Sequence, residues 1–389
     1  MGELLKQNSA IEAVRADRLY RLLGVRLEGK GVFVREEKLG RQIRARVLHR
    51  VESGDFMYSR LFAWRGAFGV IPESMNGAYV SNEFPNFKID KNRIHDKYLE
   101  FYFWEKSIWK DVEKKCTGTT KASRNRFKEK FFLDFEIPLP PLEEQKSIAE
   151  RIQKLVATVE EAKKFGAAAT SETQTLFEHT VGKAFEDISQ VNKQRLSTLT
   201  TKIGSGSTPL GGRKTYPSSG IPFIRSLNVR MRKFQRDGMV FISRETHERM
   251  HGTKVRPNDV LLNITGASIG RVACVPADLA EANVNQHVSI VRPNEVLNPR
   301  YLMYWLSQPS IQDLIDEKQK GETREGLTKE QMGSFEVPVP KLVEQHRIVA
   351  YLDSLQQKVD ELEKLQTETE IEIGAIVPSI LERAFKGEL

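Results

Sequence analysis

Two long stretches of the chain carry apolar residues at the alternating three- and four-residue spacing of a coiled-coil helix. The first, within 135–188, has apolar or small residues at Ile148, Ile152, Leu155, Val159, Ala162, Gly166, Ala169 and Leu176. The second, within 335–389, has them at Ile348, Leu352, Leu355, Val359, Leu362, Ile373, Ile376 and Ile380, with a polar break at Gln366 and Thr369. Neither helix can bury its stripe alone, so we predict that the two pair as an antiparallel coiled coil. This pairing places the middle of the first helix, where the seam residues are only Ala162, Gly166 and Ala169, opposite the polar break of the second.

Both predicted helices begin after the same motif. FEIPLPPLEEQKSIAERIQKL at 135–155 returns as FEVPVPKLVEQHRIVAYLDSL at 335–355, an offset of 200 residues, and nine of the 21 aligned positions are identical. In both copies a proline-rich run ends where the helical spacing starts, and acidic residues follow in the first turn, where the helix dipole favours negative charge. Pro378 stands where the first helix has Glu178, so we expect a kink or break there.

The segments 1–134 and 189–334 have the short β-prone runs and turn residues of mixed modules. After a short polar helix or arm at 1–18, the first module is repeated in the second. The matches are Asp55 with Asp259, Gly66 with Gly266, VSNEF at 80–84 with VNQHV at 284–288, and a predicted helix at 97–104 with one at 300–307. We predict an α+β fold in which two α/β modules alternate with two long helices, an internal duplication with pseudo-two-fold symmetry.

Charge is divided in the same way. The net charge of +8 resolves into +9 for residues 1–134, −4 for 135–190, +8 for 191–334 and −5 for 335–389. Two basic modules alternating with two acidic helices indicate a protein that holds a polyanion with its modules. Charge that only confers solubility is the alternative. A helix of 45 residues is about 68 Å long, about the length of 20 base pairs of duplex.

Basic and amide side chains near turns are the residue types that contact phosphates and base edges. In the first module the candidates for DNA contact are Arg35, Lys38, Arg41, Arg60, Arg65, Lys121, Arg124 and Arg126. In the second module they are Arg213 and Lys214 in a glycine-rich loop, with Arg225, Asn228, Arg230, Arg232, Asn285, Gln286 and His287.

The remaining composition points away from other classes of protein. Cys116 and Cys274 have no metal-ligand spacing and fit a reducing cytoplasm, and no apolar run approaches the length of a membrane span. No P-loop lysine and no methyltransferase cofactor loop is present, so we expect no cofactor in this chain. No catalytic constellation is visible, and we expect a non-catalytic protein.

One segment formally matches a catalytic motif. HERMH at 247–251 has the H-E-x-x-H spacing of a helical zinc site. Gly252 and Pro257 follow too soon for a long helix, and no third ligand stands out. A zinc-dependent hydrolase or nuclease using His247, Glu248 and His251 is one alternative function, and a coiled-coil scaffold is another.

The chain resembles the specificity subunits of type I restriction-modification systems over nearly its whole length. The motifs that carry the resemblance are PLPPLEEQ at 138–145, PVPKLVEQ at 338–345, GSTP at 206–209, GIPFI at 220–224, NDVLLNITGASIG at 258–270, VNQH at 284–287 and AFKGEL at 384–389. The resemblance implies two target recognition domains, 1–134 and 189–334, separated by spacer helices at 135–188 and 335–389.

The resemblance also implies a function. Each recognition domain would bind one half of a split target in double-stranded DNA, and the helices would fix the spacer between the halves. The chain would bind two methyltransferase subunits and, through them, restriction subunits that translocate DNA. S-adenosylmethionine would be used by the methyltransferase partner and not by this chain.

Overall fold

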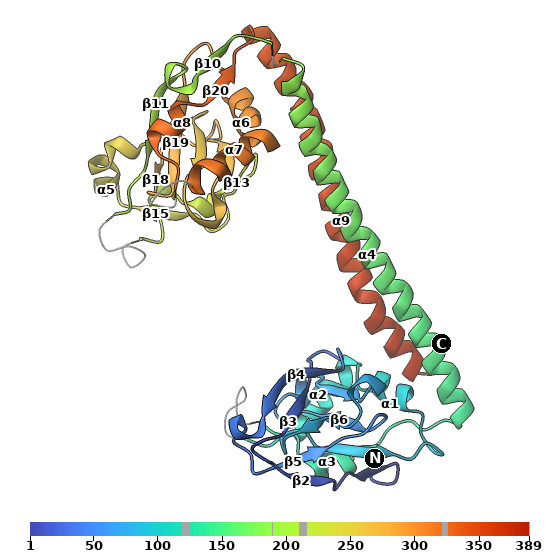
Figure 1. Ribbon diagram of the computed structural model, residues 1–389. Coiled ribbons are helices and arrows are strands. Elements are labelled where there is room, and N and C mark those ends of the chain that lie inside the picture. Colours follow the sequence, from blue (N-terminus) through green and yellow to red (C-terminus); the bar gives the residue numbers. More distant parts are fainter. Residues whose placement is uncertain (119–124, 189, 210–215, 321–325, 389) are drawn as a thin grey trace. The chain divides into compact units, whose positions relative to one another are not determined.

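The computed structural model describes residues 1–389 except 119–124, 189, 210–215, 321–325 and 389 (Figure 1). The chain forms two compact units, one made of residues 1–167 and 367–389 and the other of 168–366. Each unit therefore combines one module with part of each long helix.

The first unit contains two sheets. In strand order, one is β1 (Leu5–Gln7), β9 (Asn86–Ile89), β6 (Phe56–Tyr58) and β7 (Phe68–Val70), and the other is β2 (Ile11–Ala13), β5 (Val47–Arg50), β8 (Tyr79–Val80), β3 (Leu19–Val25) and β4 (Val32–Leu39). The predicted polar helix or arm at 1–18 is wrong, because this segment supplies β1 and β2. Leu4 and Leu5 are buried there, and β1 pairs with β9.

Aromatic side chains fill the core of this unit. Phe56, Tyr58, Phe68, Phe103 and Phe132 are all fully buried, and the Phe68 and Phe103 rings stack at a centroid distance of 4.3 Å. The helices that contribute to this core are α1 (Asp96–Tyr102), α2 (Lys106–Lys115) and α3 (Glu129–Leu133), and the short 3-10 helices are η1 (Gly40–Gln42), η2 (Ala63–Arg65) and η3 (Glu73–Met75). The helix expected at 97–104 is thus confirmed.

The second unit is built in the same way. Its main sheet has the order β11 (Thr200–Ser205), β19 (Val288–Pro293), β16 (Val260–Asn263) and β17 (Val272–Cys274). Three smaller sheets are β15 (Val240–Ile242) with β12 (Ile221–Ile224) and β18 (Asn283–Val284), β13 (Val229–Arg230) with β14 (Lys233–Phe234), and β10 (Lys193–Arg195) with β20 (Glu336–Pro338). Its helices are α5 (Arg244–Arg249), α6 (Pro299–Ser307), α7 (Pro309–Lys320) and α8 (Lys329–Gly333), with 3-10 helices η4 (Leu196–Thr198), η6 (Ser226–Asn228), η7 (His251–Thr253) and η8 (Gly266–Ser268).

Strand order confirms the internal duplication. The sheet β1-β9-β6-β7 of the first unit has the same order as β11-β19-β16-β17 of the second, with all neighbours antiparallel. The parallel pair β3–β8 likewise has its counterpart in β12–β18. Asp55 and Asp259 are both buried just before the equivalent strands β6 and β16, which confirms that match.

A glycine in the left-handed region marks the same turn in both modules. Gly66 has φ of 74° and Gly270 has φ of 82°. Each is covered by a side chain from the helix that follows α1 or α6, Trp109 in the first module and Gln312 in the second, so that a Cβ atom would lie within 2.4 Å of that side chain. The sequence-based pairing of Gly66 with Gly266 is therefore wrong.

Both long helices are joined to their modules by a buried glutamine. Gln345, in the first turn of α9 (Leu342–Phe385), accepts a hydrogen bond from the Asn298 N–H at 2.8 Å and donates to the carbonyls of Val296 and Pro340, each at 2.9 Å. Tyr301 Oη adds a bond of 2.7 Å to the Pro338 carbonyl. All polar groups of the Gln345 amide face main-chain partners, which fixes the start of the helix against the module.

The first module has the same joint. Gln145, in the first turn of α4 (Leu142–Glu186), accepts from the His95 N–H at 2.9 Å and donates to the carbonyls of Arg93 at 3.1 Å and Pro140 at 2.8 Å. Tyr98 Oη donates to the Pro138 carbonyl. The duplicated motif found in the sequence therefore encodes a duplicated hydrogen-bonded joint.

The long helices pack together and run antiparallel, as predicted. In the second unit Thr170 Oγ1 bonds to Gln366 Oε1 at 2.8 Å, and Gln174 to Glu363 at 3.1 Å, so partner positions decrease along α9 as they increase along α4. Phe177 and Leu352 are buried in the same core.

Two columns of residues were predicted to form the seam between the helices, and only one of them is buried. One column, with Ile152, Val159, Leu352 and Ile380, is buried. The other is exposed at Leu155 (38%), Leu176 (68%), Leu362 (46%) and Ile376 (41%), because the residue that follows each of these takes the inward position. The inward residues are Val156, Phe177, Glu363 and Val377.

The second long helix is continuous through its proline. α9 extends from Leu342 to Phe385 with Pro378 inside it. Of the kink or break expected at this position, the break is therefore wrong. Ile380 and Leu381, just after the proline, are buried in the core of the first unit, and this packing stabilises the last turns against the loss of one main-chain hydrogen bond.

Candidate nucleic-acid interface

A cleft of about 460 Å³ in the first module gathers several of the predicted basic residues. Arg35 and Lys38 of β4 line it, together with Arg44 and with Ser81 from the turn after β8. Glu36 lies between the two β4 cations, 2.6 Å from Arg35 Nη2 and 2.5 Å from Lys38 Nζ, and hydrogen bonds from Lys38 and Arg35 lower the pKa of this carboxyl. The cleft therefore keeps an excess of positive charge.

Of four other candidates in the first module, the structure describes two, Arg41 and Arg65. Arg41 lies in η1 at the surface, next to the cleft-lining residue Gln42. Arg65 is exposed, with its guanidinium 5.9 Å from the Trp64 ring centroid. Lys121 and Arg124 lie outside the residues that the structure describes.

Arg60 and Arg126 are held in ion pairs. Arg60 pairs with Glu129, and both side chains are about four-fifths buried. Arg126 bonds through Nε and Nη2 to the two carboxylate oxygens of Glu83 at 3.2 and 3.1 Å. The Arg60 N–H also donates to the Glu83 carbonyl at 3.0 Å. In this structure the two arginines organise the turn that contains Glu83, directly after Asn82.

Four side chains of the second module form a polar chain. Thr208 Oγ1 donates to Gln286 Oε1, Gln286 Nε2 lies 3.1 Å from His287 Nε2, and His287 Nδ1 lies 2.5 Å from Thr265 Oγ1. These residues come from the loop after β11, the turn between β18 and β19, and the segment after β16. Gln286 is exposed, so these four bonded side chains hold an amide at the surface.

Residues next to these four side chains either shape the turn or line a second cleft. Asn285 is 7% exposed, and its Oδ1 accepts from the His287 N–H at 3.2 Å, so it shapes the turn. A cleft of about 460 Å³ is lined by Thr208, Ser243 and Arg249, among others. The predicted Arg213 and Lys214 lie outside the described residues.

The candidates at 225–230 serve mainly to hold a loop. Asn228 is fully buried, and its Nδ2 donates to the Gln235 carbonyl at 3.0 Å. Its amide is therefore engaged within the protein and does not reach the surface. Arg225 Nη2 donates to the Gly238 carbonyl at 2.7 Å. Arg230 is exposed and bonds to Gln235 Oε1 at 2.9 Å.

Arg232 faces the long helices. Its guanidinium carbon lies 4.8 Å from the Phe177 ring centroid on α4, and its Nε donates to Gln356 Oε1 on α9 at 3.1 Å. Burial lowers the pKa of this guanidinium, and nearby Glu178 opposes that effect. Arg232 thus ties the second module to both helices within the second unit. Its φ of 60° is the left-handed conformation that two-residue hairpin turns favour.

The HERMH segment does not have the geometry of a helical zinc site. α5 ends at Arg249, so His247 and His251 are not on one α-helix. His247 is 3% exposed, with Nδ1 2.5 Å from Asn283 Oδ1. Within the described part of the chain, no three His, Cys, Asp or Glu side chains are grouped as metal ligands would be.

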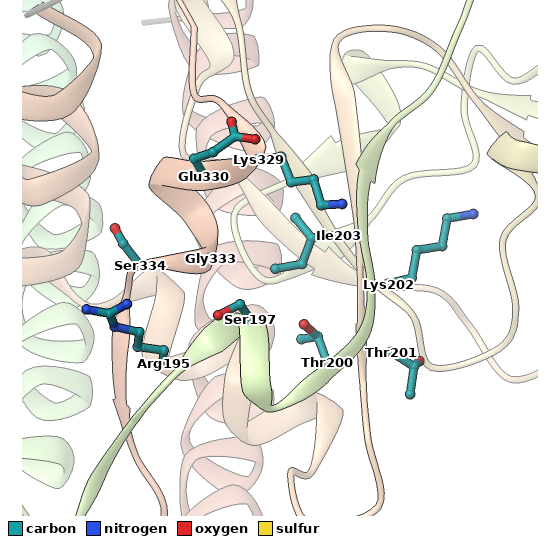
Figure 2. A pocket seen from close by; sticks show the side chains of 10 residues that line it. All are labelled: Arg195, Ser197, Thr200, Thr201, Lys202, Ile203, Lys329, Glu330, Gly333 and Ser334. Carbon is teal, nitrogen blue, oxygen red and sulfur yellow. The ribbon is translucent and has the colours of Figure 1, made fainter.

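Figure 2 shows a third cleft, of about 520 Å³, in the second module. Cations from three elements border it: Arg195 of β10, Lys202 of β11 and Lys329 of α8. Arg195 and Lys202 point to opposite sides, and the Ser197 hydroxyl lies between them. Burial, with repulsion from Arg292, lowers the pKa of Lys202, whose Nζ donates to the Gly252 carbonyl at 2.7 Å.

Some surface residues of these clefts were not predicted. Arg44, Arg249, Arg195 and Lys329 line them. Asn82 was missed as well, although the match of VSNEF with VNQHV places it opposite Gln286. Applying that match to single residues would have identified it.

Comparison with known proteins places these modules in a family. The model of a family described as the type I restriction modification DNA specificity domain matches residues 57–165 and 187–373, more than half of the chain. The chain is 28% identical over 318 residues to the specificity subunit of the type I restriction enzyme EcoBI of Escherichia coli, which covers 76% of this chain and 66% of that protein. It is 25% identical over 291 residues to a putative type I restriction enzyme MjaX specificity subunit of Methanocaldococcus jannaschii, covering 70% and 64%. The chain thus matches just under two thirds of the length of these relatives.

Solved structures share the fold. A chain from a study of complex assembly and conformational transition in the type I R-M system aligns with a TM-score of 0.74 at 22% identity, covering 100% of this chain and 97% of that chain. The HsdS subunit from Thermoanaerobacter tengcongensis aligns with a TM-score of 0.56 at 23% identity, covering 100% and 96%. Across the described residues, no helix combines the length and apolar character needed to cross a bilayer.

Proposed function

The chain belongs to the family defined by the type I restriction modification DNA specificity domain, and on that basis we propose that it is the subunit that gives a restriction-modification complex its DNA target. Each module would bind one half of a split target in double-stranded DNA. The observation that carries this proposal is the duplication: two modules of one topology each place a polar, cation-bearing cleft beside an exposed amide turn.

The basic residues of the clefts would supply phosphate contacts. Arg35, Lys38 and Arg44 line the first cleft, with Arg41 nearby, and Arg249 lines the second. Such contacts position a protein on the duplex without reading its sequence, and each neutralised phosphate adds to the salt dependence of binding. The exposed Arg65 and Arg230 belong to the same set of proposed contacts, as do Lys121, Arg124, Arg213 and Lys214.

The long helices would dock the methyltransferase subunits. The apolar residues displaced from the seam remain at the surface: Leu155 and Ile376 in the first unit, Leu176 and Leu362 in the second. Each directly precedes an inward position, so within each unit the two side chains flank the seam along one edge of the antiparallel pair. Phe165 and Leu365, 200 residues apart, add exposed side chains at 68% and 52%. Exposed apolar stripes of this kind mark protein-binding surfaces.

The duplication would give two such docking surfaces, and hence two methyltransferase subunits per chain. Those subunits would bind S-adenosylmethionine and carry out the chemistry, with restriction subunits joining through the complex. This chain would have no catalytic residues and would act on DNA in the cytoplasm. The length of the helix pair would set the spacer between the two half-targets.

A methylated-base map of the host genome, with and without this gene, tests the proposal. We expect a split motif with a fixed gap to lose its methylation when the gene is deleted. An unchanged map, in a strain whose methyltransferase is shown to be expressed, would contradict the proposal.

A further inference from the structure

The two modules place a side-chain amide at the same point of the fold. β8 ends at Val80 and β18 ends at Val284, and both strands run parallel to the equivalent strands β3 and β12. Two residues beyond these ends stand Asn82 and Gln286, and both are exposed. Topology alone therefore makes these two amides equivalent, although the surrounding loops differ in sequence.

In each module the residue that follows the amide is held by a side chain from another segment. Glu83 receives two hydrogen bonds from Arg126, and His287 contacts Thr265. The side chains that fix the turn differ in charge and size between the modules, while the amide is retained. These contacts hold the turn in both modules at the residue next to the amide.

The orientation of the Gln286 amide follows from its neighbours. Its Oε1 accepts from Thr208, so its Nε2 faces His287 Nε2 at 3.1 Å. An amide nitrogen can only donate, so His287 Nε2 is the acceptor and the imidazole proton is on Nδ1, which donates to Thr265 Oγ1. Assigned in this way, the network uses one lone pair of Oε1 and one N–H of Nε2.

One lone pair and one N–H of Gln286 are then left for a ligand. This acceptor and donor complement the N6 donor and N7 acceptor that adenine presents in the major groove, the base edge that Gln and Asn side chains bind through two hydrogen bonds. Asn82, whose side chain makes no hydrogen bond to the residues that the structure describes, offers the same groups on a shorter stem.

The setting of both amides fits contact with DNA. Ser81, adjacent to Asn82, lines the cleft that contains Arg35 and Lys38. Thr208, bonded to Gln286, lines the cleft that contains Arg249. Cations able to bind phosphates therefore lie beside an amide able to bind a base, the division of labour that sequence-specific interfaces use.

We propose that Asn82 and Gln286 are equivalent base-reading residues, each recognising one adenine in the half-target of its own module. The inference rests on the proposed function and extends it to single residues. It also makes Thr208 and His287 positioning residues, which act by holding the Gln286 amide.

The test compares Gln286→Ala and Asn82→Ala in the full-length chain, purified with its methyltransferase. Each complex is used to select the duplexes that it binds from a randomised library. We expect Gln286→Ala to lower discrimination for adenine roughly 5- to 150-fold, the range for one two-bond base contact, at one position of one half-target only. Asn82→Ala should do the same in the other half. Gln194→Ala, which removes an exposed amide on β10, should leave the target unchanged.

Two further variants sharpen the result. Gln286→Glu replaces the amide by an acceptor, so the preference at that position should shift towards cytosine, whose N4 donates. Thr208→Val should weaken the adenine preference less than Gln286→Ala does. A uniform loss of affinity with the same target, or an unchanged target, would refute the inference while leaving the proposed function intact. If the unaltered complex selects no split target, the proposed function fails, and this inference fails with it.

Discussion

The joint between module and helix provides a quantitative test of what holds the second unit together. Gln345 is fully buried and makes three hydrogen bonds to main-chain groups, the Asn298 N–H and the Val296 and Pro340 carbonyls. In Gln345→Ala all three groups lose their partner at once. Each bond contributes about 1 kcal/mol, and an unsatisfied buried group costs about 1–3 kcal/mol. Three unsatisfied groups cost at least about 3 kcal/mol, and single substitutions rarely cost more than about 5 kcal/mol, so we expect the free energy of unfolding to fall by about 3–5 kcal/mol.

The measurement is urea-induced unfolding of the isolated chain, followed by far-UV circular dichroism. For a unit of about 200 residues the loss corresponds to roughly 6–20 °C in melting temperature. Gln345→Glu keeps the side-chain volume but turns an acceptor towards two carbonyls, so it should destabilise the unit about as much. The matched control is Gln357→Ala, an exposed glutamine on the same helix, which should change stability by less than about 0.5 kcal/mol. If Gln345→Ala also falls in that small range, the joint is not what fixes the helix to the module.

Three further predictions follow from individual contacts. Leu176→Glu with Leu362→Glu should abolish co-purification of the methyltransferase while leaving the unfolding midpoint unchanged, because both side chains are exposed; intact co-purification would exclude this docking surface. Arg232→Met should accelerate hydrogen exchange in the β13–β14 turn, because it removes the bond to α9 and the charge on the Phe177 ring; unchanged exchange would contradict the proposed tie. Burial raises the pKa of the Cys116 thiol to about 11 and that of Cys274 to about 12. Since the thiolate is the reactive form, alkylation of the urea-unfolded chain should level off at about pH 10, roughly one unit above the ordinary thiol pKa. Alkylation of the folded chain should keep accelerating beyond that pH, and identical profiles would refute the shift.

The duplicated joint could be predicted from sequence because its determinants are local. Proline fixes the backbone before the helix, acidic residues follow in the first turn, and Gln145 and Gln345 recur at one offset. The strand orders then confirmed that the modules are repeated. What the sequence could not show is why the glutamines recur, since their partners at 93–95 and 296–298 are about 50 residues away in the chain.

The register of the helix pair was only partly predictable. A stripe of apolar residues is compatible with two neighbouring columns, and choosing the more hydrophobic one placed Leu155 and Leu176 in the seam. The structure turns the helices so that Val156 and Phe177 face inward and the middle carries Thr170 bonded to Gln366. A surface that binds another protein keeps apolar residues outside, and this weakens the pattern on which the prediction relies.

The sequence predicted which types of side chain form the candidate interface, but it did not predict which individual residues do so. Asn228 and Arg232 were both predicted as residues that read base edges, but Asn228 is buried in a loop and Arg232 packs on the helices. Asn82 was missed. Exposure depends on tertiary packing, which composition does not reveal. Comparing the two modules position by position carries more information, because equivalent positions occupy the same place in the same backbone fold.

Recognition of one half-target by each module is tested most directly by an exchange of residues 189–334 for the corresponding module of another family member, followed by a map of methylated bases. One half of the split motif should change to that of the donor, while the other half and the length of the gap stay the same. A change in both halves, or in the gap alone, would contradict the claim that each module recognises its own half-target on a common helical frame.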